Sequence, residues 1–197
     1  MEQFYGAFPF PSGEEKCLSR GQRLTDRMMD YMALVIQKAL DDGTRSIHII
    51  PSFITVGLSV FPCDDDVYNT FDFVILIMNQ NDHWFLLIYE PAMSKFHLLD
   101  TVESEEYSPI DFQLLPIGDD DIVEDYYGQI PHQGNSTTNC GILTLINLAR
   151  FIADNPIVYD GSPTRINGIV RPFLSSILPT LKKSRIIDKI HLTLLLE

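Results

Sequence analysis

The first regular pattern along the chain is an apolar repeat with the spacing of a helix. Its members are Leu24, Met28, Met32, Val35 and Ala39. Residues three or four positions apart lie on one face of a helix, so the repeat predicts an amphipathic helix. We expect the helix to begin after Thr25, whose hydroxyl suits an N-cap, and to end before Gly43.

The middle of the chain alternates between β-forming runs and turn residues. The runs are SIHIIP at 46–51, FDFVILIM at 71–78, HWFLLIYE at 83–90 and KFHLLD at 95–100. Runs of β-branched and aromatic residues are typical of strands, and the polar residues 79–82 and Pro91 separate them as turns do. The pattern predicts one short strand followed by three antiparallel strands.

A second long helix is predicted in the segment CGILTLINLARFIADN at 140–155. The segment is apolar on nearly every side, which is typical of a helix buried in a core, and Asn139 suits its N-cap. More helical sequence follows from about Ser162 to Leu196. Residues 102–128 are acidic and rich in turn residues, and a short strand or helix remains an open alternative there.

Length and composition predict a single domain over residues 1–197, with an irregular N-terminal arm at 1–20. The chain has 197 residues, of which 45% are hydrophobic and 21% charged. No apolar run reaches the roughly 18–20 residues that cross a bilayer, so we expect no membrane partner. The first residues lack the basic start and apolar stretch of a secretory signal, which predicts an intracellular protein of the cytoplasm or nucleus.

Charge and cysteine content exclude several classes of function. The formal net charge of -13 argues against nucleic-acid binding, because a phosphate backbone is held chiefly by lysine and arginine. The three cysteines, Cys17, Cys63 and Cys140, are odd in number and form no C-x-x-C pair. They predict neither a disulfide framework nor a zinc site, and we expect no metal and no cofactor.

Cys140 is the first candidate for chemistry. At the first turn of a buried helix its sulfur would lie near unpaired N–H groups and the positive end of the helix dipole, which favour a thiolate. A thiolate is the form that acts as a nucleophile. The alternative is a small buried side chain with no chemical role.

A thiol nucleophile needs a base that is itself held by a third group, and His83 is the histidine that best meets this requirement. If the hairpin of residues 83–100 closes symmetrically over a loop at 90–93, His83 lies directly opposite Asp100. His97 then points to the other face of the sheet. A one-residue slip in register would separate His83 from Asp100.

Two further residues lie close in sequence to this pair and to the cysteine. Gln133 lies in the polar segment PHQGNSTTNCG, which can bend so that its amide reaches the sulfur and donates to an oxyanion, together with the backbone N–H of Cys140. Trp84, the only tryptophan, follows His83 and could cover a narrow cleft. The alternatives are a solvated loop glutamine and a core tryptophan.

The order of these residues resembles the pattern of the ubiquitin-like-protein-specific cysteine peptidases. This family includes the SUMO proteases, the deneddylases and the related adenovirus-type proteases. The matching groups are His83-Trp84, Asp100-Thr101, Gln133 and Asn139-Cys140-Gly141. RLTD at 23–26 resembles the family's W-L-x-D, although Arg23 stands where the family usually has tryptophan, and Asn139 stands where it usually has aspartate.

The resemblance implies a papain-like α+β fold, in which a mainly antiparallel central sheet packs against a buried helix that carries the nucleophile. The implied catalytic residues are His83, Asp100, Gln133 and Cys140, and the implied substrate-binding residues are Trp84, Asp26 and Gly141. The implied reaction is hydrolysis after the C-terminal Gly-Gly of a SUMO- or NEDD8-like modifier, free or conjugated. Glycine suits a tail threaded under Trp84 because it has no side chain. We expect the protein to be a monomer.

Two other functions are compatible with the same residues. The chain could keep the fold and bind a ubiquitin-like protein without cleaving it. It could instead be a cysteine-dependent acetyltransferase effector that uses acetyl-coenzyme A, although the sequence shows no basic pocket for the phosphates of that cofactor.

Overall fold

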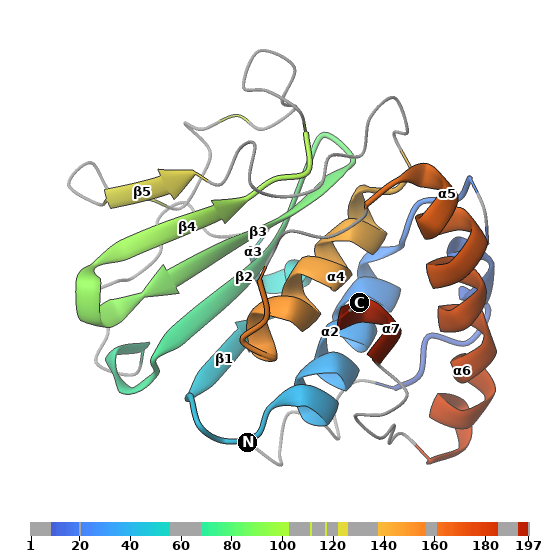
Figure 1. Cartoon of the computed structure of the whole chain (residues 1–197), viewed down its shortest axis with the longest axis horizontal. Coiled ribbons are helices and arrows are strands. Elements are labelled where there is room, and N and C mark those ends of the chain that lie inside the picture. The colour runs from blue at the N-terminus through green and yellow to red at the C-terminus, as the bar shows by residue number, and fades with distance from the viewer. Residues whose placement is uncertain are drawn as a thin grey trace.

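The core of the protein is a five-stranded sheet with long helices packed on one of its faces (Figure 1). This computed structural model describes residues 9–19, 21–55, 68–102, 111, 117, 122–125, 138–156, 161–184 and 193–196. The strands are β1 (Ile47–Ile50), β2 (Phe73–Gln80), β3 (His83–Glu90), β4 (Lys95–Leu99) and β5 (Ile122–Asp125). The α-helices are α2 (Asp26–Leu40), α3 (Ser52–Thr55), α4 (Cys140–Ile152), α5 (Pro163–Arg165), α6 (Arg171–Ser184) and α7 (Thr193–Leu196).

Short helical turns connect these elements. They are η1 (Glu15–Leu18), η2 (Tyr68–Thr70), η3 (Pro91–Met93) and η6 (Ile166–Val170). The predicted strands and the two predicted long helices are present, and η1 gives the N-terminal arm a helical turn that its sequence did not predict. The open alternative at 102–128 is answered in part by β5.

The strands lie side by side in the order β1-β2-β3-β4-β5. The three central strands are antiparallel, as predicted, whereas β1 pairs with β2 and β5 pairs with β4 in parallel. The parallel outer pairs follow from chain connections that lie outside any local pattern, since parallel neighbours need long crossovers.

Side chains from alternate positions of each strand enter two separate apolar clusters. Leu86 and Ile88 of β3 pack in the cluster that includes the helices. Phe85 and Leu87 pack in the cluster on the other face of the sheet. A strand buried on both faces appears in the sequence as a continuous apolar run, which explains the composition of β2 and β3.

The hairpin of β3 and β4 closes in a different register from the symmetric one that the sequence suggested. Glu90 pairs with Lys95 and Leu86 with Leu99, so the same register continued by one residue places Asp100 opposite Phe85, not opposite His83. The loop begins at Pro91, which has no N–H to donate to the ladder, and ends at Ser94 in the left-handed conformation. The loop is therefore 91–94 and not 90–93, and the register of the two strands differs by two residues from the predicted one. A two-residue shift keeps His83 and Asp100 on the same face.

Helix α2 begins and ends close to the predicted bounds. The Thr25 hydroxyl accepts a hydrogen bond from the Met28 N–H, which is the predicted N-cap. The helix ends at Leu40 with Asp41 as its C-cap, and Gly43 follows with a φ of +76°.

Helix α4 is buried along its whole length and lies between the sheet and α6 (Figure 1). It begins at Cys140, as predicted, and ends at Ile152, three residues before the predicted end. Asn139 occupies the N-cap position, as predicted, but its side chain makes no capping hydrogen bond. Asn139 Oδ1 instead accepts a long hydrogen bond from Arg171.

Candidate active site

Three elements bring the candidate catalytic residues together. Cys140 is the first residue of α4, His83 is the first residue of β3, and Asp100 directly follows β4. Packing of α4 on β3 holds the start of the helix against the start of the strand. Residues far apart in the sequence thus meet at one end of the sheet.

His83 and Asp100 form a buried pair. His83 Nε2 lies 2.5 Å from Asp100 Oδ1, and the two residues are only 4% and 1% exposed. The N–H of Val102 also donates to Asp100 Oδ1, at 3.1 Å. Because Nε2 is bound to the carboxylate, Nδ1 is the imidazole nitrogen that is left to interact with Cys140.

The sulfur of Cys140 is surrounded by groups that favour its charged form. Burial raises the pKa of the thiol, but hydrogen bonds from His83 and from the backbone of Trp84 and Gly141, with the charge of His83, bring the pKa below its ordinary value. Burial also lowers the pKa of His83, yet the interactions with Asp100 and Cys140 raise it to about 9. These opposite shifts favour a thiolate–imidazolium pair at neutral pH.

Trp84 and Gly141, two predicted substrate-binding residues, both contact Leu24. The indole N–H of Trp84 donates to the carbonyl of Leu24 at 3.2 Å, and the indole is only 2% exposed. A Cβ on Gly141 would lie 3.1 Å from the Leu24 side chain, so only glycine fits there without a shift. The Thr144 hydroxyl donates to the Trp84 carbonyl and links α4 directly to β3.

The other predicted site residues are at the edge of this group or outside the described residues. Asp26, the first residue of α2, is exposed and lies two positions after Leu24. Gln133 falls in a segment that the structure does not describe, as do Cys63 and His132.

Arg23, at the position where the sequence resemblance led us to expect tryptophan, makes an ion pair next to His83. Its guanidinium lies 2.7 Å from Asp82, the turn residue that precedes His83. Both side chains are exposed, so the pair contributes at most about 1 kcal/mol to stability.

The remaining described histidines and cysteine have other surroundings. His97 lies between Glu90 and Glu124, with Nε2 2.9 Å from Glu90, and projects from the opposite face of the sheet to Asp100, as predicted. His48 stacks on an aromatic ring, and its burial lowers its pKa. Burial raises the pKa of Cys17, which disfavours its thiolate.

The described residues contain neither a metal-binding cluster nor a membrane-spanning helix. No group of three or more histidine, cysteine, aspartate or glutamate side chains there could hold a metal ion. None of the described helices is long and apolar enough to cross a bilayer.

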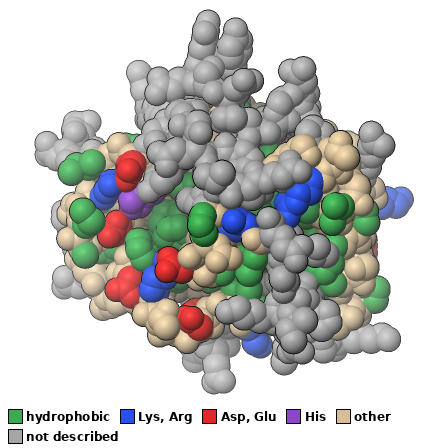
Figure 2. Space-filling model, viewed as in Figure 1, with side chains coloured by type: hydrophobic (Ala, Val, Ile, Leu, Met, Phe, Trp, Pro, Cys, Tyr) green, Lys and Arg blue, Asp and Glu red, His purple; other side chains and the backbone are tan. Residues whose placement is uncertain are grey.

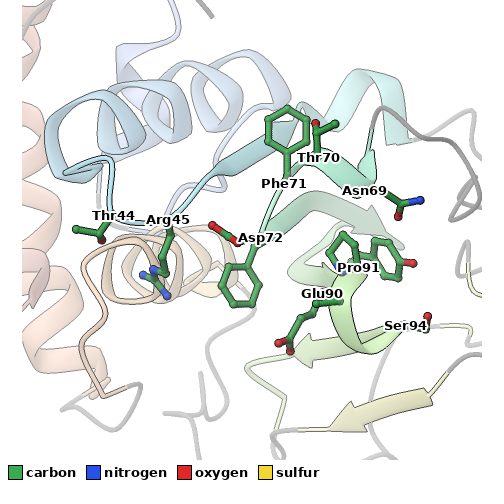
Figure 3. Close-up of a pocket in the computed structure, with 12 residues that line it drawn as sticks. Thr44, Arg45, Asn69, Thr70, Phe71, Asp72, Glu90, Pro91 and Ser94 are labelled. Atoms are coloured by element: carbon green, nitrogen blue, oxygen red, sulfur yellow. The ribbon is translucent and has the colours of Figure 1, made fainter.

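A polar cavity of about 810 Å³ lies at the opposite end of β3 from the site (Figure 3). Arg45, Asp72 and Glu90 are among its lining residues. Glu90 and His83 are the two ends of an eight-residue strand, which places them roughly 23 Å apart. The cavity therefore does not belong to the Cys140 site.

Charged side chains of both signs are interspersed with apolar ones on the face shown in Figure 2, with acidic groups gathered near the strands.

Two important residues of this site were not found by the sequence analysis. Arg171 is 1% exposed and binds the turn before Cys140, although a cation in a C-terminal helix ordinarily suggests an exposed residue. Leu24 was placed in the apolar repeat and in the RLTD segment at 23–26, but its contacts with Trp84 and Gly141 were not predicted. Neither role has a local signal, because both arise from contacts between distant segments.

The fold of this chain matches solved structures of SUMO proteases. The Ulp1 protease domain in complex with Smt3, the yeast ortholog of SUMO, aligns with a TM-score of 0.62 at 21% identity, over 85% of this chain and 81% of that chain. A de-sumoylating protease aligns with a TM-score of 0.60 at 15% identity, over 93% and 92% of the two chains. The Ulp1-like SUMO protease catalytic domain of Chaetomium thermophilum aligns with a TM-score of 0.53 at 14% identity, over 91% and 88%.

The chain has the papain-like α+β fold of the SUMO proteases. The fold prediction is confirmed at this level. No family model matches the sequence, and no curated protein matches it either. At these identities the similarity establishes the fold, and the activity must be argued from the site.

Proposed function

We propose that the protein is a cysteine peptidase that cleaves after the C-terminal Gly-Gly of a ubiquitin-like modifier of the SUMO or NEDD8 type. The observation that carries the proposal is the buried group of Cys140, His83 and Asp100 at the start of α4. The fold shared with SUMO proteases supports the choice of substrate class. An intracellular location and a monomeric state form part of the proposal.

In the proposed reaction the Cys140 thiolate attacks the glycyl carbonyl carbon, and the carbonyl π electrons move to oxygen. In this scheme the Cys140 N–H and the side-chain amide of Gln133 donate hydrogen bonds to that oxyanion. The C–N bond then breaks as His83 gives its proton to the leaving amine. Water, deprotonated by His83, attacks the thioester, and the C–S bond breaks to release the Cys140 thiolate. The acid product loses its proton to solvent and leaves as a carboxylate, which restores the thiolate–imidazolium pair.

Each supporting residue has a separate part in this scheme. Asp100 fixes the ring of His83 and stabilises the imidazolium. The backbone of Trp84 and Gly141 favours the thiolate. Trp84, whose indole is held by Leu24, would cover a glycine tail and exclude larger residues.

The proposal is tested with a panel of ubiquitin-like proteins that carry a C-terminal electrophile, using intact-mass measurement. We expect wild-type protein to form a covalent adduct with at least one SUMO- or NEDD8-like member. Cys140→Ala should abolish the adduct, whereas Cys17→Ala, which removes another buried thiol, should retain it. A folded wild-type protein that binds a member without forming an adduct would favour the binding-module alternative and contradict the proposal.

A further inference from the structure

Arg171 is a buried cation that the proposed reaction does not yet use. It is the first residue of α6 and is 1% exposed. Burying a charge is costly unless other groups compensate it, so its retention in the core needs a physical reason.

The guanidinium of Arg171 joins two segments at the candidate active site. Nη1 donates to the carbonyls of Cys17 and Ser19 at 3.1 and 3.0 Å. Nη2 donates to Gln22 O at 2.9 Å, and also to the carbonyl of Thr138 at 2.6 Å and Asn139 Oδ1 at 3.4 Å.

Both joined segments lead to the start of α4. Thr138 and Asn139 immediately precede the nucleophile, so their position sets the first turn of α4. Gln22, an acceptor of Arg171, lies two residues before Leu24, which contacts Gly141 and binds the Trp84 indole. In Figure 1 the starts of α4 and of the α5–α6 segment lie at the same end of the helical layer.

The positive charge of Arg171 has no carboxylate partner among the described residues. Its five hydrogen-bond acceptors are four backbone carbonyl oxygens and the side-chain amide oxygen of Asn139. Burial lowers the pKa of Arg171, and the ionisable groups that act against this are the thiols of Cys17 and Cys140. Arginine stays protonated in proteins, so the guanidinium remains a positive charge.

We propose that Arg171 is a positioning residue for the nucleophile, which fastens the turn before Cys140 to the N-terminal arm and supplies a positive charge that stabilises the thiolate. The proposal rests on the proposed function, because it assigns Arg171 a role in the reactivity of Cys140. The charged and titratable groups around the two side chains are His83 next to Cys140, Cys17 next to Arg171, and Glu14 next to Cys17.

Arg150 offers a matched control. It is also a buried arginine whose guanidinium donates to backbone carbonyls, those of Pro156 and Leu196. It lies ten residues after Cys140 in the same helix, roughly 15 Å away along the axis. Replacing Arg150 removes hydrogen bonds from a buried guanidinium to backbone carbonyls, but it leaves the turn before Cys140 unchanged.

The test measures the rate of Cys140 alkylation by iodoacetamide between pH 5 and 10, with mass spectrometry of the peptide that contains Cys140. We expect R171Q to raise the midpoint of the profile and slow alkylation at pH 7 by about fivefold or more, since one pKa unit is a tenfold change in thiolate. R150Q should keep the wild-type midpoint. R171K should fall between wild type and R171Q, because lysine keeps the charge but has no planar fork.

An unchanged midpoint in folded R171Q, or equal shifts in R171Q and R150Q, would overturn the proposal. If R171Q does not fold, the comparison is made between R171K and R150K. Alkylation of Cys140 that is about threefold slower than wild type in R171K, but not in R150K, supports the role. Equal alkylation rates in R171K and R150K refute it. Because iodoacetamide requires no modifier, these outcomes are independent of whether the electrophile panel finds a substrate.

Discussion

Cys140 and His83 are expected to titrate as a coupled pair, and this sets the pH dependence of the protein. The pKa of Cys140 is lowered and that of His83 is raised to about 9, so the reactive ion pair exists between these two values. Hydrolysis should rise with pH as the thiolate forms and fall above pH about 9 as the imidazolium loses its proton.

The measurement is the pH profile of Cys140 alkylation in wild type and His83→Gln. We expect the midpoint of the wild-type profile to lie below that of an ordinary thiol, and the midpoint of His83→Gln to lie higher by a unit or more, about tenfold in thiolate. Identical midpoints in the two proteins would show that His83 does not stabilise the thiolate.

Asp100→Asn should reduce catalysis much more than stability. The amide fills the same space as the carboxylate, but it cannot stabilise an imidazolium through charge or hold the same tautomer. We expect hydrolysis of a modifier with a fluorogenic C-terminal group to fall by about a hundredfold or more, with a small change in melting temperature.

Glu90→Gln is the control for Asp100→Asn because Glu90 also pairs with a histidine, His97, on the same sheet. This pair lies at the far end of β3 from Cys140. The control should leave hydrolysis unchanged, and equal losses in both variants would indicate a general effect on the sheet.

At the scale of elements, the close approach of α4 to the start of α2 depends on Gly141. Gly141→Ala places a Cβ 3.1 Å from Leu24, the residue that also anchors Trp84. We expect the free energy of unfolding to fall by about 1–3 kcal/mol and adduct formation to slow, because overpacking moves the first turn of the helix.

Gly168→Ala is the matched substitution in another helical segment. A Cβ at Gly168 meets no atom within 4 Å, and alanine favours helix by about 0.5–1 kcal/mol. Denaturant unfolding should therefore show opposite signs for the two variants. A Gly141→Ala protein as stable as wild type would contradict the close-packing explanation.

On the scale of the whole molecule, the candidate active site lies at one end of the sheet, and contacts that affect only stability lie at the other end. Arg45, at the end with the polar cavity, donates to the carbonyls of Phe151 and Ile152 at the end of α4 and pairs with Asp154. Arg45→Ala should lower the free energy of unfolding by about 1–3 kcal/mol, since it removes charged hydrogen bonds from a helix C-terminus.

The same variant should keep the wild-type rate of Cys140 alkylation, because the length of α4 separates the two ends by roughly 18 Å. Arg23→Ala is its counterpart beside His83, and loss of this exposed pair should change stability by less than about 1 kcal/mol. Thermal unfolding and alkylation of both proteins test the separation, and a loss of Cys140 reactivity in Arg45→Ala would contradict it.

Local pattern was sufficient to predict α2, α4 and the three central strands, because apolar periodicity and turn residues act over a few positions. The same strand alternation placed His83 and Asp100 on one face, although the predicted register was wrong by two residues. Pro91 and Ser94 place the loop at 91–94, which shifts the register of β3 and β4 by two residues from the predicted one. Because the shift is an even number of residues, His83 and Asp100 stay on the same face of the sheet.

The sequence by itself determined which segments form helices and strands, and it marked Cys140 at the start of a buried helix. The tertiary structure decided the parallel outer strands, the contact between Leu24 and Gly141, and the burial of Arg171 against Thr138. These features join residues that are distant in sequence, so they depend on how whole elements pack and not on the propensities of neighbouring residues.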